Sequence, residues 1–583
     1  MLKTYLNLSE KIMQDINNGK IIYKLKKISK KQEKDINQLK ENGVNEVMAS
    51  LYSLRGVENF KDINLIQKLE PFENMKGAKE AAKILSKAIL RKEKICVVAD
   101  YDVDGATACT VAVRGLKMFG ANVDYVVPDR FVHGYGLTPS VVDEAIKKKN
   151  PDLIITVDNG ISSHAGVDHA NKKGVRVLVT DHHLPGDTLP NAECIVNPNQ
   201  PGCEFKSKSI CGCGVMFYVL AALRQQMIDL EVYTTKNVPN VFSLLDLVAI
   251  GTIADVVKLD LNNRIIVNLG LNMIRKKQTR AGVLSIIQVA KRKHDQLSTT
   301  DIGFGLGPRI NAAGRLEDMT IGINCLLTDN MDTATKLAQK LNEINQSRKE
   351  LELDMKEQAM ILPSLKETKY SKVAFDESFH EGVIGIVASR IKEQFYRPTI
   401  VFAPASEEGL IKGSGRSIPE IHLRDALDYV YKKKPEIIEK FGGHAMAAGL
   451  TIKKELLNDF CDLFEEAVEI FSDGKDLLNI KEIDLNLHGS QINLENAEAI
   501  RDEIWGQGFP PPLFVGEFNI VEQKILKDAH LKLKLEKDGE YFEGIWFFTS
   551  EKLEVEKANF VYTLGINEFL NTKTVQIMVE GLY

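Results

Sequence analysis

Seven acidic or histidine side chains lie at or just after the ends of three apolar runs. They are Asp100, Asp102 and Asp104 after ICVVA, Asp158 after LIITV, and Asp181, His182 and His183 after RVLVT. A further acid, Asp255, follows the apolar run DLVAIGTIA, and Gly105 permits a tight backbone turn behind the first group. In open α/β sheets, ligands bind outside the carboxyl ends of the strands, so we expect these side chains to converge at one rim.

This set of oxygen and nitrogen donors predicts a site for divalent metal ions. Carboxylates with one or two imidazoles suit Mn²⁺, and tolerate Mg²⁺, better than they suit calcium or structural zinc. Two such ions, about 3.5 to 4 Å apart, would stabilise the attacking and leaving oxygens of an in-line displacement and lower the pKa of a bound water. A single strand-end aspartate could equally be a helix cap or a turn residue. The joint arrangement favours phosphodiester hydrolysis without a side-chain nucleophile.

The elements that must position these residues follow an α/β pattern. From about residue 75, apolar strands alternate with helices, which implies a parallel sheet covered on both faces. A long charged helix follows, then a small second α/β unit with glycine-rich turns at GSGRS and GGHAMAAG, and then alternating runs that predict a β-barrel. We therefore expect a Lys-rich helical extension at 1–45, a catalytic domain at 46–328, a connecting helix at 329–362, a substrate-binding domain at 363–456 and a β-barrel at 457–583.

Composition indicates a folded soluble protein, with 44% hydrophobic and 27% charged residues among 583. No apolar run is long enough to cross a bilayer, and the start lacks the apolar block of a secretory signal, so we expect a cytoplasmic protein. The net charge of −5 neither supports nor excludes nucleic acid as a partner.

The motifs DYDVDG, VDNG and TDHH, in this order and with ADVV later, resemble the DHH phosphoesterase superfamily. Within it, GLGPRINAAGRLED, EGVIGIVASRI, GSGRS and GGHAMAAGL resemble the RecJ family of single-strand-specific DNA exonucleases. The resemblance covers roughly residues 50–583. It implies a parallel-sheet DHH domain, a DHHA1-like domain, an OB-like barrel and degradation of single-stranded DNA from the 5′ end to mononucleotides, in DNA repair and recombination.

The resemblance also implies roles for individual residues. The implied ligands of two Mn²⁺ or Mg²⁺ ions are Asp102, Asp104, Asp158, His182 and Asp255. His183 would contact the scissile phosphate, Asp100 would orient ligands, and Asp181 would position the histidines. Substrate would be held by the phosphate-binding candidates Arg309, Asn311, Arg315, Ser414, Arg416 and His444, with Arg130 as a weaker candidate. For the barrel aromatics we expect core positions, namely Phe509, Phe514, Trp546, Phe547 and Phe548.

Two alternatives stay open at this point. One is a DHH phosphoesterase that acts on oligoribonucleotides or small nucleotides, and the other is an inactive DNA-binding scaffold. The second would normally lack ligands, whereas every expected acid and histidine is present. A single-strand-binding protein and a helicase are open as further partners, and a monomer is the default.

Overall fold

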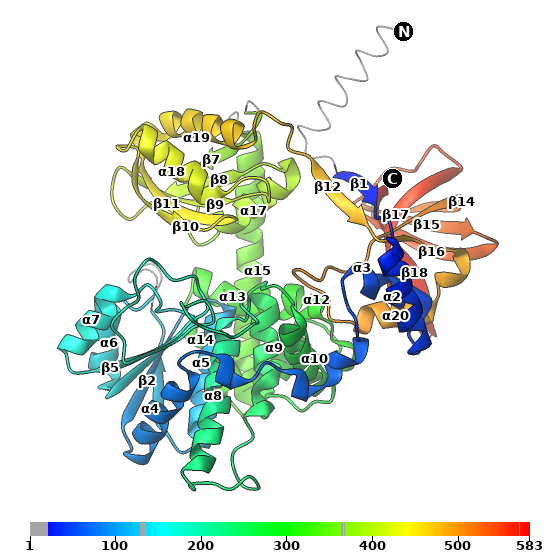
Figure 1. Cartoon of the computed structure of the whole chain (residues 1–583). Coiled ribbons are helices and arrows are strands. Elements are labelled where there is room, and N and C mark those ends of the chain that lie inside the picture. Colours follow the sequence, from blue (N-terminus) through cyan, green and yellow to red (C-terminus); the bar gives the residue numbers. More distant parts are fainter. Residues whose placement is uncertain (1–20, 129–135, 363–364, 366–367, 571) are drawn as a thin grey trace.

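The computed structural model describes residues 21–128, 136–362, 365, 368–570 and 572–583. They form three units, arranged around a long helix that Figure 1 shows running from the first unit to the second. This helix, α15, spans Met331–Ile361 and has 31 residues, so at about 1.5 Å per residue it is about 45 Å long. Among the described helices, none combines the length and the apolarity needed to span a bilayer.

A parallel five-stranded sheet, in the order β3-β2-β4-β5-β6, is the centre of the first unit. Its strands are β2 (Lys94–Ala99), β3 (Asn122–Val126), β4 (Leu153–Val157), β5 (Arg176–Thr180) and β6 (Cys194–Val196). One face packs on α4 (Ala78–Leu90), α5 (Val103–Met118) and α8 (Gly212–Asp229). The other packs on α6 (Pro139–Lys149) and α7 (His164–Lys172). The expected sheet with two covered faces is confirmed.

Helices complete the first unit and lead into α15. They are α9 (Leu245–Ala254), α10 (Leu261–Arg275), α11 (Ala281–Val289), α12 (Thr299–Asp301), a π-helical turn η6 (Ile302–Leu306), α13 (Gly307–Leu316) and α14 (Thr320–Leu327). Among these elements, α9 contacts α5 and η6, and α13 contacts α15. The helices therefore connect the acid-bearing edge of the sheet to the long helix.

The second unit is a mixed sheet in the order β10-β11-β9-β8-β7. Its strands are β7 (Lys372–Phe375), β8 (Thr399–Pro404), β9 (Leu410–Arg416), β10 (Ile438–Gly443) and β11 (Ala447–Lys453). Helices α15 and α17 (Ile384–Phe395) cover one face, and α18 (Leu423–Lys433) and α19 (Leu457–Phe471) cover the other. Because α19 packs into this core, we propose to place the domain boundary after Phe471 rather than at 456.

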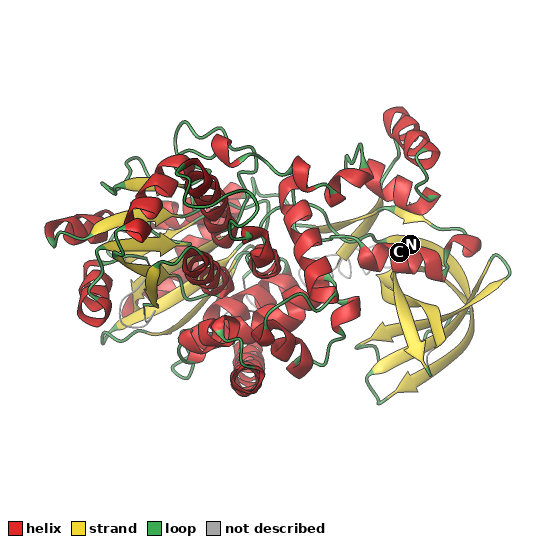
Figure 2. Cartoon of the chain, turned by 90° about the horizontal axis from the view of Figure 1, so that it is seen from below, coloured by secondary structure: helices red, strands yellow, loops and turns green. Residues whose placement is uncertain are grey.

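Six strands form the sheet of the third unit; pairing of β14 with β17 closes five of them into a barrel, and β13 pairs with β14 outside the closed ring. They are β13 (Leu485–Asn486), β14 (Phe514–Leu526), β15 (His530–Lys537), β16 (Glu540–Phe547), β17 (Lys557–Phe569) and β18 (Thr572–Leu582). Seen from below, the barrel and the parallel sheet lie at opposite ends of the molecule (Figure 2). Phe509 and Phe514 are core residues as expected, but Phe547 and Phe548 are exposed, because they lie at and just beyond the end of β16.

Two further local expectations were wrong. Residues Ile21–Leu25, expected as helix, form strand β1, which pairs in parallel with β12 (Asn479–Ile483). The GSGRS segment, expected as a turn, lies mostly in β9, because Gly413–Arg416 pair with both β8 and β11. In both places the partner strands decide the conformation. Residues 1–20 of the expected Lys-rich extension lie outside the described residues.

Candidate metal centre

The loop from β2 to α5 places three aspartates at the carboxyl edge of the parallel sheet. Asp102 is the N-cap of α5 and accepts a hydrogen bond from the backbone N–H of Gly105 at 2.9 Å. Asp104, in the first turn of α5, accepts the N–H groups of Gly212 at 2.5 Å and Cys213 at 2.9 Å. These N–H groups begin α8, where the helix dipole favours negative charge. The start of α8 therefore fixes the carboxylate of Asp104, a role that the sequence did not reveal.

Residues from three other elements converge on this loop. Asp158 follows β4 with a φ of +62°, in the left-handed region that few side chains adopt. The Nε2 atom of His182, after β5, lies 3.1 Å from Asp158 Oδ1, 3.6 Å from Asp255 Oδ2 and 3.9 Å from Asp104 Oδ2. Asp255 is the C-cap of α9. The four side chains expected to share a metal site with Asp102 therefore come together.

Asp181 holds the two histidines. Its Oδ1 atom accepts the backbone N–H groups of His182 at 2.7 Å and His183 at 3.1 Å, and lies 2.7 Å from His183 Nδ1. Asn197 and Asn199 donate their side-chain amides to the carbonyls of His183 at 2.9 Å and His182 at 2.6 Å. Sequence reasoning missed these two asparagines, although their motif NPNQ follows the histidines by 13 residues of loop and short strand.

The electrostatics of the cluster favour a bound cation. Burial, and next the charge of Asp104, raises the pKa of Asp102, Asp158 and Asp255, the last two well above the usual carboxyl range. Burial lowers the pKa of His182, which favours the neutral imidazole that binds metals. Burial opposes a charge on His183 as well. However, the hydrogen bond to Asp181 and the negative charge of Asp181 raise the pKa of His183 to about 9.

The donor atoms fit divalent ions. The ligand atoms of Asp104, His182 and Asp255 lie within 4.8 Å of one another, and so do those of the set Asp100, Asp102 and Asp158. Within the described part of the chain, His182 Nε2 and Asp255 Oδ2 are buried without a hydrogen-bond partner. Buried polar atoms without such a partner are costly, and a bound cation would satisfy them.

Helix α13 lies directly against the acid-bearing loop, which gives its candidate residues mixed roles. Asn311 Oδ1 accepts the N–H of Val103 at 3.1 Å, so this side chain holds the start of α5. Arg315 donates to the carbonyl of Gly382 at 3.4 Å, and its charge lowers the pKa of Asp102 against the effects of burial and Asp104. Arg309 donates to Gly305 O at 2.6 Å and to Asn342 Oδ1 at 3.0 Å.

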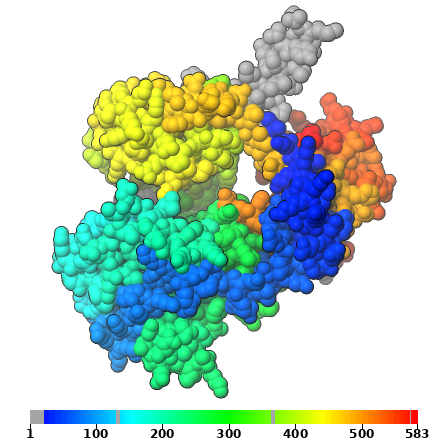
Figure 3. All heavy atoms as spheres, viewed as in Figure 1, coloured from blue at the N-terminus to red at the C-terminus, as the bar shows by residue number. Residues whose placement is uncertain are grey.

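The second unit supplies the remaining substrate candidates. Arg416 Nη1 donates to Ser414 Oγ at 3.2 Å, and a Cβ on Gly385, at the start of α17, would lie 2.9 Å from Ser414 Oγ. Burial and then the charge of His183 lower the pKa of His444, so the charge of a first-unit histidine acts on the second unit. Figure 3 shows a hollow between the yellow second unit and the cyan and green first unit. Arg130 lies outside the described residues.

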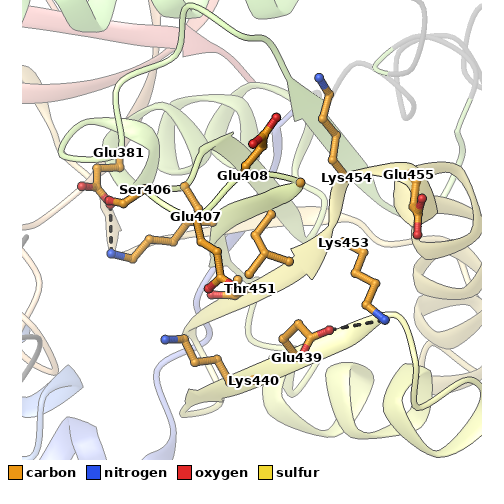
Figure 4. Close-up of a pocket in the computed structure, with 14 residues that line it drawn as sticks. Glu381, Ser406, Glu407, Glu408, Glu439, Lys440, Thr451, Lys453, Lys454 and Glu455 are labelled. Carbon is orange, nitrogen blue, oxygen red and sulfur yellow. Dashed lines mark hydrogen bonds and ion pairs between the residues drawn. The ribbon is translucent and has the colours of Figure 1, made fainter.

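A cavity of about 1030 Å³ lies on the second unit, and none of the candidate metal ligands lines it (Figure 4). Lys412 lines it and shares a strand face with Ser414, because side chains two apart point the same way. Its amino group pairs with Glu381 at 2.9 Å, and Lys453 pairs with Glu439 at 3.5 Å. Since its charges are largely balanced, this cavity is not the candidate metal centre.

Comparison with known proteins gives the same three units. Residues 94–252 match the DHH family, N-terminal domain, residues 367–470 match the DHHA1 domain, and residues 483–581 match the RecJ OB domain. The chain is 43% identical over 553 residues to the single-stranded-DNA-specific exonuclease RecJ of Salmonella typhimurium, covering 92% of this chain and 96% of that protein.

Solved structures agree across nearly the whole chain. The structure of RecJ from Thermus thermophilus in complex with Mn²⁺ has a TM-score of 0.82 at 27% identity, covering 97% of this chain and 79% of that one. The same protein in complex with Mg²⁺ has a TM-score of 0.76 at 26% identity, covering 96% and 78%. Both crystal structures therefore hold a metal of the type that the donor set predicts. The chain belongs to the RecJ family of single-stranded-DNA-specific exonucleases, metal-dependent phosphoesterases of the DHH type.

Proposed function

We propose that this exonuclease degrades single-stranded DNA from the 5′ end to mononucleotides, and that two divalent ions serve the hydrolysis. The observation that carries the proposal is the pair of neighbouring donor sets, one around Asp104, His182 and Asp255 and one around Asp100, Asp102 and Asp158. Because His182 Nε2 lies 3.1 Å from Asp158 Oδ1, the two sets meet at Asp158.

Each residue has a defined task in this proposal. Asp102, Asp104, Asp158, His182 and Asp255 hold the ions, which when bound stabilise charge on the phosphate and lower the pKa of a water. Asp100 orients the first loop, since its Oδ1 accepts the N–H of Tyr101 at 2.8 Å. Asp181 positions both histidines. Because Asp181 holds a proton on His183 Nδ1, the Nε2 atom on the opposite edge of the ring can contact the scissile phosphate.

The second unit would receive the phosphate at the strand end. Ser414 and Arg416 lie beside the start of α17, where backbone N–H groups and the helix dipole favour an anion. Arg309 and Arg315 on α13 flank the path between the units. A 5′ phosphate seated there would present the first phosphodiester to the acids and set the polarity of digestion.

The family match favours the exonuclease over a small-nucleotide phosphoesterase or an inactive scaffold. We further propose that the chain acts as a monomer in DNA repair and recombination, since one chain supplies all three units around the hollow of Figure 3. A single-strand-binding protein and a helicase would supply unpaired DNA to it.

The decisive test uses one oligonucleotide, labelled at either end and offered single-stranded or in a duplex, with Mn²⁺, Mg²⁺ or a chelator. We expect mononucleotides from the 5′ end of the single strand only, and loss of at least about a thousandfold in rate in Asp158→Ala, because removal of a shared ligand disrupts both donor sets. Asp168→Asn, on the exposed side of α7, is the matched control and keeps full activity. Release of mononucleotides from the 3′ end would refute the proposed polarity. A single bound ion per chain, measured by calorimetry, would refute the two-ion proposal.

A further inference from the structure

Large apolar side chains are exposed at the rim of the acid cluster. Leu184, which follows His183, is 62% exposed, and Val256, which follows Asp255, is 65% exposed. Phe304, in the π-helical turn η6, is 76% exposed. A single exposed apolar residue is ordinary, but several beside one site indicate a surface that contacts a ligand.

The turn that carries Phe304 packs on the helix that carries Asp255. A Cβ on Gly303 would lie 3.7 Å from Ile253 Cγ2, and a Cβ on Gly307 would lie 3.4 Å from Ala254 Cβ. Ile253 and Ala254 form the last turn of α9, immediately before Asp255. Phe304 therefore projects from a wall that begins at the metal centre.

The backbone on this wall adopts unfavourable conformations at two places. Val256 has a φ of +59°, which is rare for a β-branched residue and costs free energy. Residues Ile302–Leu306 form a π-helical turn, which is uncommon and occurs frequently at functional sites. Neither conformation buries the exposed side chains, so core packing does not account for them.

Two arginine side chains lie near the turn that carries Phe304. Arg309 donates to Gly305 O at 2.6 Å, and a Cβ on Gly305 would lie 3.7 Å from Arg292 Nε. Arg292 also pairs with Asp301 at 3.2 Å. Two guanidinium groups therefore lie against Gly305, the residue that follows Phe304. Proteins bind single strands with aromatic rings that stack on bases and nearby cations that contact phosphates.

We propose that Phe304 stacks on one base of the DNA strand close to the cleaved phosphodiester. Phe304 is a positioning residue, because it holds a base while the acids and histidines face the phosphate. A base within a duplex is already stacked and paired, so this surface accepts only an unpaired strand. Part of the single-strand specificity would thus arise beside the metal centre itself.

The test scans one abasic residue along a single-stranded oligonucleotide, position by position from each end, and measures kcat and KM for the wild type and Phe304→Ala. We expect one position where loss of the base lowers wild-type kcat/KM by about tenfold, the effect of one stacking contact. Phe304→Ala should lower kcat/KM on intact DNA by a similar factor, mainly by raising KM. In this variant an abasic residue at that one position should cause no further loss of kcat/KM, whereas abasic residues elsewhere should act as in the wild type.

Two further variants keep the result interpretable. Phe304→Trp retains a stacking ring and should restore both the activity and the sensitivity to the abasic residue. Phe471→Ala removes an exposed ring from α19, on the side of the second unit turned away from the first in Figure 1, and should behave as wild type. Wild-type kinetics in Phe304→Ala, or losses that multiply with the abasic effect at every position, would overturn the proposal. Because Phe304 is exposed, an unchanged melting temperature is expected for each variant.

Discussion

At the scale of residues, Asp158 has the most demanding position in the candidate metal centre. Its φ is +62°, and burial and the charge of Asp104 raise its pKa well above the usual carboxyl range. A carboxylate held in this way costs free energy when no cation is present. The cluster therefore lowers the stability of the metal-free protein. A substitution that removes one negative charge should raise that stability.

Asp158→Asn should raise the melting temperature of the metal-free protein while it abolishes exonuclease activity. The folded-state pKa of Asp158 is raised, so the native state binds more protons than the unfolded state, and metal-free stability falls as pH rises from about 4 toward that pKa. Melting curves in chelator at pH 5 to 8 should show this fall in the wild type, and a smaller fall in Asp158→Asn. A variant that melts lower than the wild type at pH 8 would contradict the expected repulsion.

The sequence predicted the acids and histidines because their types and strand-end spacing carry the chemistry. It could not predict the groups that hold them. Asp104 is fixed by the backbone N–H groups of Gly212 and Cys213, and a backbone donor leaves no signal in the residue type that would identify its partner. Asn311 stays a predicted substrate ligand, and the sequence did not reveal that its Oδ1 also holds the start of α5.

At the scale of elements, helix α13 sets the position of the acid-bearing loop. A Cβ on Gly314 would lie only 1.9 Å from the carbonyl oxygen of Tyr101, next to Asp102. Glycine at this position therefore allows the helix to pack directly on the loop backbone. The glycines of the GLGPRINAAGR segment thus act in packing, while Arg309 and Arg315 donate to Gly305 and Gly382 and are proposed to bind substrate.

Gly314→Ala should reduce activity by about 100-fold, because a displacement of roughly 1 Å of the loop misplaces Asp102 and Asp104. The added methyl group should also destabilise the first unit by about 1 to 3 kcal/mol. Steady-state kinetics with saturating Mn²⁺ and a melting curve measure the two effects. Gly186→Ala is the control, since its Cβ would have no heavy atom within 4 Å, and should match the wild type. Full activity in Gly314→Ala would show that the loop tolerates displacement.

Periodicity predicted the elements whose own apolar pattern identifies them as helix or strand, whatever the distance to their partners. The parallel sheet, the long helix α15 and the barrel strands agree with their patterns. The helix predicted at residues 21–25 was wrong because this segment, β1, pairs with β12, which lies more than 450 residues later. No local pattern indicates that pairing. The glycines of GSGRS suggested a turn, whereas two neighbouring strands hold the segment extended.

At the scale of the whole molecule, the N-terminal region is part of the barrel unit. Besides the β1–β12 pairing, Asp484 accepts from Lys26 Nζ at 3.0 Å and from Arg55 Nη2 at 2.9 Å. A second buried pair, Arg264 with Glu503 at 3.0 Å, joins the first unit to the barrel unit. Figure 3 shows the blue N-terminal residues against the orange and red third unit. Buried ion pairs thus help to fix the position of the barrel relative to the acids.

Asp484→Asn should loosen this connection. The side chains of Asp484 and Arg55 are only 3% and 4% exposed, so the substitution leaves a buried guanidinium without its counter-charge, at a cost of about 3 to 5 kcal/mol. We expect the barrel unit to melt at a lower temperature and to become sensitive to protease, while Arg264 and Glu503 still hold its other side. Long oligonucleotides should then be digested with lower processivity, whereas the rate on oligonucleotides too short to reach the barrel should stay at the wild-type value.

The matched control is Asp473→Asn, because Asp473 and Lys475 form a pair that is 82% and 77% exposed. Exposed pairs contribute little, so this variant should melt and digest like the wild type. If Asp484→Asn slowed short and long oligonucleotides equally, the ion pair would support the catalytic unit rather than the placement of the barrel. If it changed neither melting nor processivity, the strand pairing of β1 with β12 alone would hold the N-terminal region in place.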